Sequence, residues 1–158
     1  MLSACGGWHL RGRGPGKIHF ETAFIKSVNA RKVSDALRQE LYARGIVVTN
    51  NRKQAEVILE LSGERFDRRV LSVDSKTGKV REIELGLQTY FAVRERNGKL
   101  LIPNSALNWE LDYVFDEDSL LATNEQDNVV RRDLAETAAT TLVLRLQAIR
   151  LSATDQID

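Results

Sequence analysis

Two pairs of carboxylates are the side chains of this chain most suited to acid-base chemistry. Glu82 and Glu84 form one pair, and Glu110 and Asp112 form the other. Within each pair the residues are two positions apart, which places both on the same face of a β-strand. Such a pair can transfer protons when a cleft encloses it. Both pairs fall at polar positions of predicted strands, so we expect solvated charge and no catalytic residue.

Metal and nucleophile chemistry has less support. The two histidines, His9 and His19, lie near one end of the chain, and neither has a cysteine at the spacing of a metal site. The sequence contains no Gly-x-Ser-x-Gly motif and no glycine-rich phosphate-binding loop. We therefore expect that the protein is not an enzyme and uses no metal and no cofactor.

Cations are concentrated between positions 64 and 81. This segment contains six basic and three acidic residues: Arg65, Arg68, Arg69, Lys76, Lys79 and Arg81 against Glu64, Asp67 and Asp74. Cations on a protruding hairpin can contact the phosphates of an amphiphile or a membrane surface. Charged residues on exposed strands also block unwanted pairing between sheet edges. From the residues alone we favour edge protection, and phosphate contact is the alternative.

The only cysteine, Cys5, cannot form an intramolecular disulfide. Leu2 stands three residues before it and Ala4 directly before it, which is the pattern of a bacterial lipobox. There the thiol takes up a diacylglyceryl group, and the small preceding residue lets a peptidase cleave the chain. A signal peptide also needs a basic segment and an apolar run, and only four residues precede Cys5. Lipid attachment and an ordinary buried or terminal cysteine are therefore both open.

Composition places the chain among globular proteins of one domain. The chain is 42% hydrophobic and 28% charged, and its net charge is +1. A nucleic-acid-binding domain usually shows a stronger basic excess, so we expect no nucleic-acid partner. No apolar run approaches the length of a membrane-spanning helix. Any membrane attachment is therefore expected to come through Cys5.

The first part of the chain predicts a strand, a helix and a second strand. A glycine-rich joint at residues 12–16 precedes a short strand at 17–21, in which Ile18 and Phe20 alternate with polar residues. Apolar residues at four-residue steps predict a helix over 28–44. Gly45 follows, where a left-handed cap residue is expected. This order indicates a crossover unit with two parallel strands.

Residues 55–115 predict three long antiparallel strands with one apolar and one polar face. The polar residues at 74–79 form a turn between the first two strands. An Asn-Gly pair at 97–98 is the strongest short hairpin signal in the sequence and separates the last two. A sheet of this kind is covered on one side only.

The alternation of apolar and polar residues in these strands changes phase twice. Leu87 should lie opposite Trp109, but a regular register from the hairpin turn would place it opposite a polar residue. One extra residue in the last strand removes this mismatch, and Pro103 marks a place where it can be tolerated. A similar change occurs around Gly63. We therefore predict β-bulges near Gly63 and Pro103.

The chain ends in a predicted helix that runs to about Arg150. Thr123 and Gln126 have the spacing of a capping box, so we expect the helix to begin there. Its inner face consists of apolar residues at helical spacing: Val130, Leu134, Ala138, Leu142, Leu146 and Ile149. The elements together predict an α+β fold, β-α-β-β-β-α, in which two helices pack on one face of a four-stranded mixed sheet with long antiparallel strands.

Two short motifs resemble one protein family. Residues 5–11, Cys-Gly-Gly-Trp-His-Leu-Arg, look like the start of the mature lipopolysaccharide-assembly lipoproteins of the LptE family. Residues 124–127, Asn-Glu-Gln-Asp, look like the motif that opens the last helix of that family. The predicted order of strands and helices is similar as well, and the resemblance covers the chain from Cys5 to about Ile149.

The resemblance implies a non-enzymatic outer-membrane lipoprotein of Gram-negative bacteria that faces the periplasm and a barrel lumen. LptE-like proteins form a heterodimer with the large β-barrel translocon LptD and lie inside it as a plug. They assist the assembly of that barrel, bind lipopolysaccharide and help to insert it at the cell surface. The alternative is a stand-alone lipoprotein that faces the periplasm and binds lipid A or another anionic amphiphile.

The resemblance also implies roles for individual residues. Cys5 becomes the site of lipid attachment. Basic residues at the tip of the first long hairpin are implicated in lipopolysaccharide binding in the family, which points to Lys76, Lys79 and Arg81 as contacts to its phosphates. A second basic position expected directly before the Asn-Glu-Gln-Asp motif is not found, because residues 121–123 are Leu-Ala-Thr.

The same resemblance implies a division of the chain into four parts. Residues 1–4 are then the remnant of a removed signal peptide, and residues 5–16 are the lipidated N-terminus and its tether. A single α+β domain follows at residues 17–150, and residues 151–158 form a flexible tail. One acyl chain anchors a protein only marginally, so the implied tri-acylation matters for membrane attachment.

Overall fold

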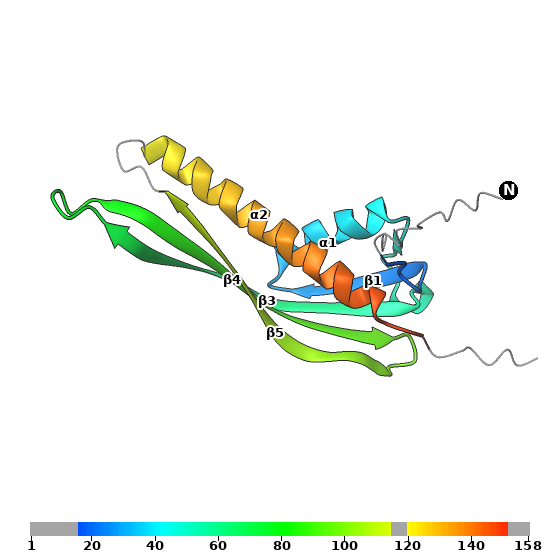
Figure 1. The fold of residues 1–158 in the computed structure, drawn as a ribbon. Coiled ribbons are helices and arrows are strands. Elements are labelled where there is room, and N and C mark those ends of the chain that lie inside the picture. The colour runs from blue at the N-terminus through cyan, green and yellow to red at the C-terminus, as the bar shows by residue number, and fades with distance from the viewer. Residues whose placement is uncertain (1–15, 115–119, 152–158) are drawn as a thin grey trace, which may run out of the picture.

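The computed structural model describes residues 16–114 and 120–151 as one mixed sheet with two long helices on one of its faces (Figure 1). The element order is β1 (Thr22–Val28), α1 (Arg31–Ala43), β2 (Val47–Val48), the 3-10 helix η1 (Arg52–Gln54), β3 (Val57–Val73), β4 (Val80–Glu95), β5 (Leu100–Val114) and α2 (Leu120–Gln147). The predicted α+β class is confirmed. Cys5 and residues 152–158 of the tail predicted at 151–158 lie outside the described residues.

The sheet has five strands in the order β2-β1-β3-β4-β5, so the prediction of four strands is wrong. The additional strand is β2, which contains only Val47 and Val48 and pairs in parallel with β1. Two residues are too few for an alternating pattern to be read from sequence. The parallel crossover is confirmed, because β1 also pairs in parallel with β3.

The strand predicted at residues 17–21 is displaced, since β1 begins at Thr22. Ile18 and Phe20 are buried, with 7% and 3% of their surface exposed, and they belong to the main hydrophobic core. Their alternation with polar residues therefore marked burial but not strand pairing. Ladder pairing starts where the backbone reaches β2 and β3, at Thr22 and Ala23.

Helix α1 begins three residues later than predicted because the backbone turns sharply before it. Asn29 has a positive φ of 51°, and the N-cap residue Ala30 has no side chain that can accept a hydrogen bond. The carboxylate of Glu64, from β3, takes over this role: it accepts hydrogen bonds from Lys32 N at 3.3 Å and Val33 N at 2.8 Å. At the other end, Gly45 has a φ of 77°, which confirms the predicted left-handed residue.

Both predicted β-bulges are present. Between β3 and β4 the register shifts between Ser62 and Arg65, around Gly63. Between β4 and β5 it shifts between Phe91 and Val93, opposite Pro103. Leu87 consequently lies opposite Trp109, as expected. A further shift near Val70 and Ser72 was not predicted.

The bulge at Gly63 connects the sheet to helix α1. Gly63 has a positive φ of 64°, a conformation that glycine adopts without steric cost. The extra residue in the bulge directs the Glu64 side chain to the first turn of α1, and Glu64 N donates to Asn29 O at 2.7 Å. One irregularity in β3 therefore satisfies amide groups at the start of a distant helix.

Helix α2 lies along the sheet and supplies much of the core. All six residues of its predicted inner face are buried: Val130, Leu134, Ala138, Leu142, Leu146 and Ile149. Ala135 and Ala139 are also buried, and short side chains there allow the helix to approach its neighbours closely. The helix packs against α1, β4 and β5, so the core lies between the two helices and one face of the sheet.

The predicted start of α2 is wrong. The helix begins at Leu120, which places Thr123 inside it and not before it. Residues 120–122, Leu-Leu-Ala, are good helix formers and extend the helix toward its N-terminus. At the other end α2 stops at Gln147, three residues before the predicted Arg150. Arg150 lies outside the helix, and its guanidinium donates a hydrogen bond to the last helical carbonyl, Gln147 O, at 3.2 Å.

Candidate functional site

The tip of the β3–β4 hairpin is built around the carboxylate of Asp74. Asp74 Oδ1 accepts hydrogen bonds from Lys76 N at 2.9 Å and from Thr77 N at 2.8 Å. Its other oxygen, Oδ2, accepts from the Arg81 guanidinium at 2.6 Å. Gly78 closes the turn with a positive φ of 70°. These contacts hold the turn in one shape and leave the Lys76 side chain exposed at its outermost part.

Asp74 and Arg81 stabilise each other in their charged forms. The hydrogen bond from Arg81, together with those from the turn amides, holds the pKa of the Asp74 carboxyl well below its usual range. The hydrogen bond to Asp74 in turn raises the pKa of Arg81. The charge of Arg81 is therefore partly neutralised by a neighbour inside the turn, and both groups stay ionised at physiological pH.

The six cations predicted as a cluster have different surroundings. Arg65 pairs with Asp67 at 3.0 Å, Arg69 pairs with Glu84 at 2.7 Å, and Arg68 lies 4.0 Å from Asp127 of α2. Together with the Arg81–Asp74 pair, these contacts neutralise much of the basic excess along the strands. Among the residues that the structure describes, the Lys76 ammonium makes no ion pair. The structure thus brings Lys76, Lys79 and Arg81 together at the hairpin tip and separates them from the other arginines.

The carboxylate pairs lie on the face of the sheet opposite the helices. Glu84 is held by Arg69, and Glu82 accepts a hydrogen bond from the Ser72 hydroxyl at 2.9 Å. Glu110 and Asp112 are exposed on β5. Glu82, Glu110 and Asp112 match the expectation of solvated charge, whereas Glu84 is paired with Arg69 and its side chain is only 15% exposed.

The Asn-Glu-Gln-Asp motif has a role that the sequence did not reveal. Gln126 Nε2 donates to Val114 O at 3.1 Å, which ties α2 to the end of β5. Asp127 accepts a hydrogen bond from the Tyr113 hydroxyl and pairs with Arg68 of β3. The sequence predicts only a helix start at this motif, but its last two residues bind the helix to two strands.

The contact with Asp127 also affects the pKa of Tyr113. Burial of the ring and the hydrogen bond to Asp127 raise the pKa of Tyr113, although the nearby Arg68 acts in the opposite direction. Nearby, the guanidinium of Arg131 lies 4.9 Å from the centre of the Phe66 ring, a favourable cation–π distance. The hairpin side of α2 is therefore attached by polar and aromatic contacts as well as by the core.

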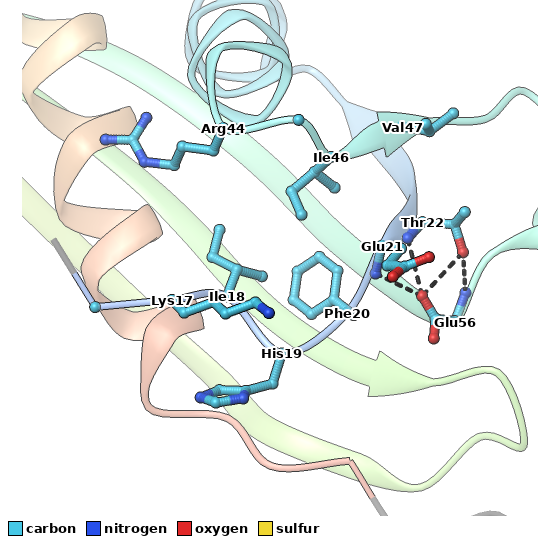
Figure 2. A pocket seen from close by; sticks show the side chains of 12 residues that line it. Lys17, Ile18, His19, Phe20, Glu21, Thr22, Arg44, Ile46, Val47 and Glu56 are labelled. Carbon is cyan, nitrogen blue, oxygen red and sulfur yellow. Dashed lines mark hydrogen bonds between the residues drawn. The ribbon is translucent and has the colours of Figure 1, made fainter.

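Away from the hairpin tip, a hollow of about 800 Å³ lies at the start of β1 (Figure 2). Ile18, Phe20 and Ile46 form its apolar lining, while Lys17 and Arg44 lie at its edge. It lies at the opposite end of β3 from the hairpin tip (Figure 1). The strand is 17 residues long, so the two places are roughly 50 Å apart at about 3.3 Å per residue.

The carboxylate at this hollow serves the backbone. Glu56 Oε2 accepts hydrogen bonds from Glu21 N at 2.6 Å and Thr22 N at 2.9 Å. Burial raises the pKa of Glu56, but the two backbone hydrogen bonds and the Thr22 hydroxyl more than offset this, so the net pKa is lowered. Figure 2 shows these contacts at the rim, where they fasten β1 to β3.

Neither helix in the described parts of the chain is long and apolar enough to cross a membrane. Comparison with solved structures identifies lipoproteins of the same fold. Lipoprotein B from Nitrosomonas europaea matches with a TM-score of 0.71 at 20% identity, covering 90% of this chain and 92% of that one. Rare lipoprotein B from Shewanella oneidensis gives a TM-score of 0.65 at 20% identity and covers 80% and 93%.

A minor lipoprotein from Acinetobacter baumannii is similar as well, with a TM-score of 0.64, 19% identity and coverage of 84% of this chain and 98% of that one. Comparison of the sequence with curated proteins finds no match. The model of the family LptE, lipopolysaccharide-assembly, matches residues 20–146. The chain therefore belongs to the LptE family, and this membership supports a role in lipopolysaccharide transport as an outer-membrane lipoprotein.

Proposed function

We propose that this protein is the plug and assembly partner of the LptD β-barrel, and that it binds lipopolysaccharide through the tip of its β3–β4 hairpin. The observation that carries the proposal is the family match over residues 20–146, which includes the sheet, both helices except the last residue of α2, and the hairpin. The protein acts by binding and positioning, without catalysing a reaction.

The geometry of the tip supports phosphate binding. Asp74 holds the turn amides and Arg81, so the turn is already ordered before a ligand arrives. A rigid turn loses little conformational entropy when it binds. Lys76 then projects positive charge from this turn toward phosphates, and Lys79 and Arg81 add positive charge beside it, that of Arg81 partly neutralised by Asp74. Positive charge on Lys76 and Lys79 suits the phosphorylated end of lipopolysaccharide.

Membrane attachment through Cys5 is part of the same proposal. Gly16, the first described residue, lines the hollow at β1, and Cys5 stands eleven positions before it in the sequence. Acyl chains on Cys5 then hold that end of the molecule at the membrane surface. The hairpin tip, roughly 50 Å away along β3, is free to reach into a barrel lumen.

The proposal is tested by isolating the acylated protein from outer membranes with a C-terminal tag and identifying its largest partner. We expect a large β-barrel in equimolar amount, and a mass for the N-terminal peptide that includes three acyl chains on Cys5. Depletion of the protein should leave that barrel misassembled. The matched control is Cys5→Ser, which keeps the fold and loses the acyl chains.

Two results contradict the proposal. Recovery of the acylated protein without any barrel, together with binding of lipid A by the protein alone, identifies a stand-alone amphiphile-binding lipoprotein instead. An unmodified Cys5 in the membrane-extracted protein rules out the anchor.

A further inference from the structure

Strand β5 is a long open edge of the sheet. It contains 15 residues, Leu100–Val114, and among the described strands it pairs with β4 alone. The opposite edge of the sheet is β2, which has two residues. Edge strands expose backbone N–H and C=O groups that can pair with another chain. Of the two edge strands, only β5 is long enough to pair with an extended segment of another molecule.

Common forms of edge protection are lacking along most of β5. Proteins usually protect an edge with lysine, proline, a bulge or a covering element. The proline and the bulge here lie near the start of the strand, at Pro103. Beyond it, residues 104–114 contain no lysine and no arginine, and their pairing with β4 is regular from Ser105 to Val114. The charged residues of this ten-residue stretch are the carboxylates Glu110 and Asp112, which disfavour pairing with acidic segments and leave the edge open to basic ones.

The two faces of this stretch differ in chemistry. On the open face, Glu110 and Asp112 lie opposite Gly86 and Glu84 of β4. Within the described parts of the chain neither carboxylate has a cation partner. The nearby cation on this face, Arg69, pairs with Glu84. On the helix face Leu111 remains 39% exposed. An added strand would thus meet negative charge on one face and apolar surface on the other.

A hollow beside the carboxylates adds room for a long side chain. It measures about 220 Å³ and is lined by residues that include Gly86, Glu110 and Asp67. Gly86 creates it because glycine has no side chain, and a Cβ at this position would meet no atom closer than 3.8 Å. A lysine or arginine opposite Glu110 could lay its aliphatic part over Gly86.

We propose that β5 is a docking edge for an extended segment of a partner protein, which adds to the sheet as a further strand. The segment carries lysine or arginine at alternate positions opposite Glu110 and Asp112, and apolar residues between them opposite Leu111 and its neighbours. It belongs to a loop or terminus, because the strands of a closed barrel have no free edge. This inference is independent of the function proposed above.

The test uses the full protein and a capped nine-residue peptide that alternates lysine with valine. Titration followed by NMR and amide hydrogen exchange should show saturable binding. Every second amide of residues 105–114 should gain protection, because only alternate N–H groups of an edge strand point outward. A peptide of the same sequence with N-methyl groups on alternate residues keeps the charge and loses the donors, so it should not bind.

Charge complementarity is tested with the double variant Glu110→Lys/Asp112→Lys. Replacing two attractive cross-strand pairs by two repulsive ones should weaken peptide binding about tenfold or more. The control is Asp35→Lys/Glu136→Lys, which changes net charge equally on the exposed sides of α1 and α2 and should leave binding intact.

Three results overturn the proposal. The first is no binding of the alternating peptide. The second is equal binding of the N-methylated peptide, which would indicate electrostatic adhesion without strand addition. The third is protection confined to other elements. The comparison of the two peptides uses unmodified protein and stays decisive even if the β5 variant does not fold.

Discussion

At the scale of single residues, carboxylates hold this fold together at places where the chain has no local partner. Glu64 caps a helix more than thirty positions away in sequence, Glu56 holds the first residues of β1, and Asp74 orders the hairpin tip. Each accepts hydrogen bonds from backbone amides, and such bonds to a charged acceptor are stronger than neutral ones. These three acidic residues therefore act as structural acceptors.

Glu64→Ala should lower the free energy of unfolding by about 1 to 2 kcal/mol, because the first amides of α1 lose their only side-chain acceptor. Glu64→Gln retains an acceptor oxygen without the charge, so a smaller loss is expected. Urea unfolding at neutral pH measures both. A Glu64→Ala protein as stable as the parent would contradict the capping role.

The Glu56 carboxylate should make stability depend on pH. Its pKa is lowered in the folded state, so its contribution is present above the unfolded value of about 4.3 and is lost as the pH falls through the folded pKa. Glu56→Gln is expected to cost roughly 1 kcal/mol at pH 7, a figure reduced for partial exposure to solvent.

The measurement for Glu56 is urea unfolding of parent and variant at several pH values. The difference between the two proteins should shrink as the pH falls below about 4.3, because Glu56 becomes protonated first in the unfolded and then in the folded state. A difference that stays constant from pH 7 to pH 2 would mean that packing, and not ionisation, is responsible. Glu21→Gln provides a control, because Glu21 is an exposed neighbour.

At the scale of elements, α2 is fastened at several places along its length. Its buried face packs into the core, while Gln126 and Asp127 bind β5 and β3 near its beginning. Farther along, the Trp109 indole donates to the Thr141 hydroxyl at 3.3 Å. These polar contacts set the position of the helix along the strands, which apolar packing alone specifies less sharply.

Asp127→Ala should destabilise the protein by about 1 to 2 kcal/mol, because Tyr113 and Arg68 lose a shared acceptor. The larger effect is expected locally: amide hydrogen exchange should accelerate over residues 120–130 more than in the rest of α2. Glu125→Ala, at an exposed position two residues earlier, is the control. Uniform acceleration along the whole helix would indicate global destabilisation and contradict a local fastening.

At the scale of the whole molecule, the long strands separate two ends with different surfaces. The start of β1, with the hollow beside it, lies at one end, and the hairpin tip lies at the other (Figure 1). Strands β3 and β4 pair along their whole length, and only β-bulges interrupt the pairing. The molecule is therefore built as a rigid spacer that presents charge far from its N-terminal end.

The double variant Lys76→Glu/Lys79→Glu should weaken binding of lipopolysaccharide about tenfold or more and reduce its dependence on salt, since two phosphate-directed charges are reversed. The fold should be unaffected, because Asp74 and Arg81 still order the turn. Arg52→Glu/Lys53→Glu, with the same charge change at the other end of β3, is the control. Equal binding by parent and tip variant would contradict this site.

Local patterns in the sequence determined much of the architecture. The inner face of α2, the left-handed Gly45, the parallel crossover and the two bulges follow from periodicity and from the backbone freedom of glycine, which act over a few residues. The bulges could be predicted because a phase change in an alternating pattern must be absorbed by an extra residue.

Contacts between distant segments were decided only by the tertiary structure. The site of β1 depended on where β2 and β3 offered pairing partners, and the cap of α1 came from Glu64. The sequence grouped six cations and placed Lys76, Lys79 and Arg81 at the hairpin tip, but only the folded sheet showed which acidic residues pair with the four arginines. Such pairings depend on which strands become neighbours, and local composition carries no information about that.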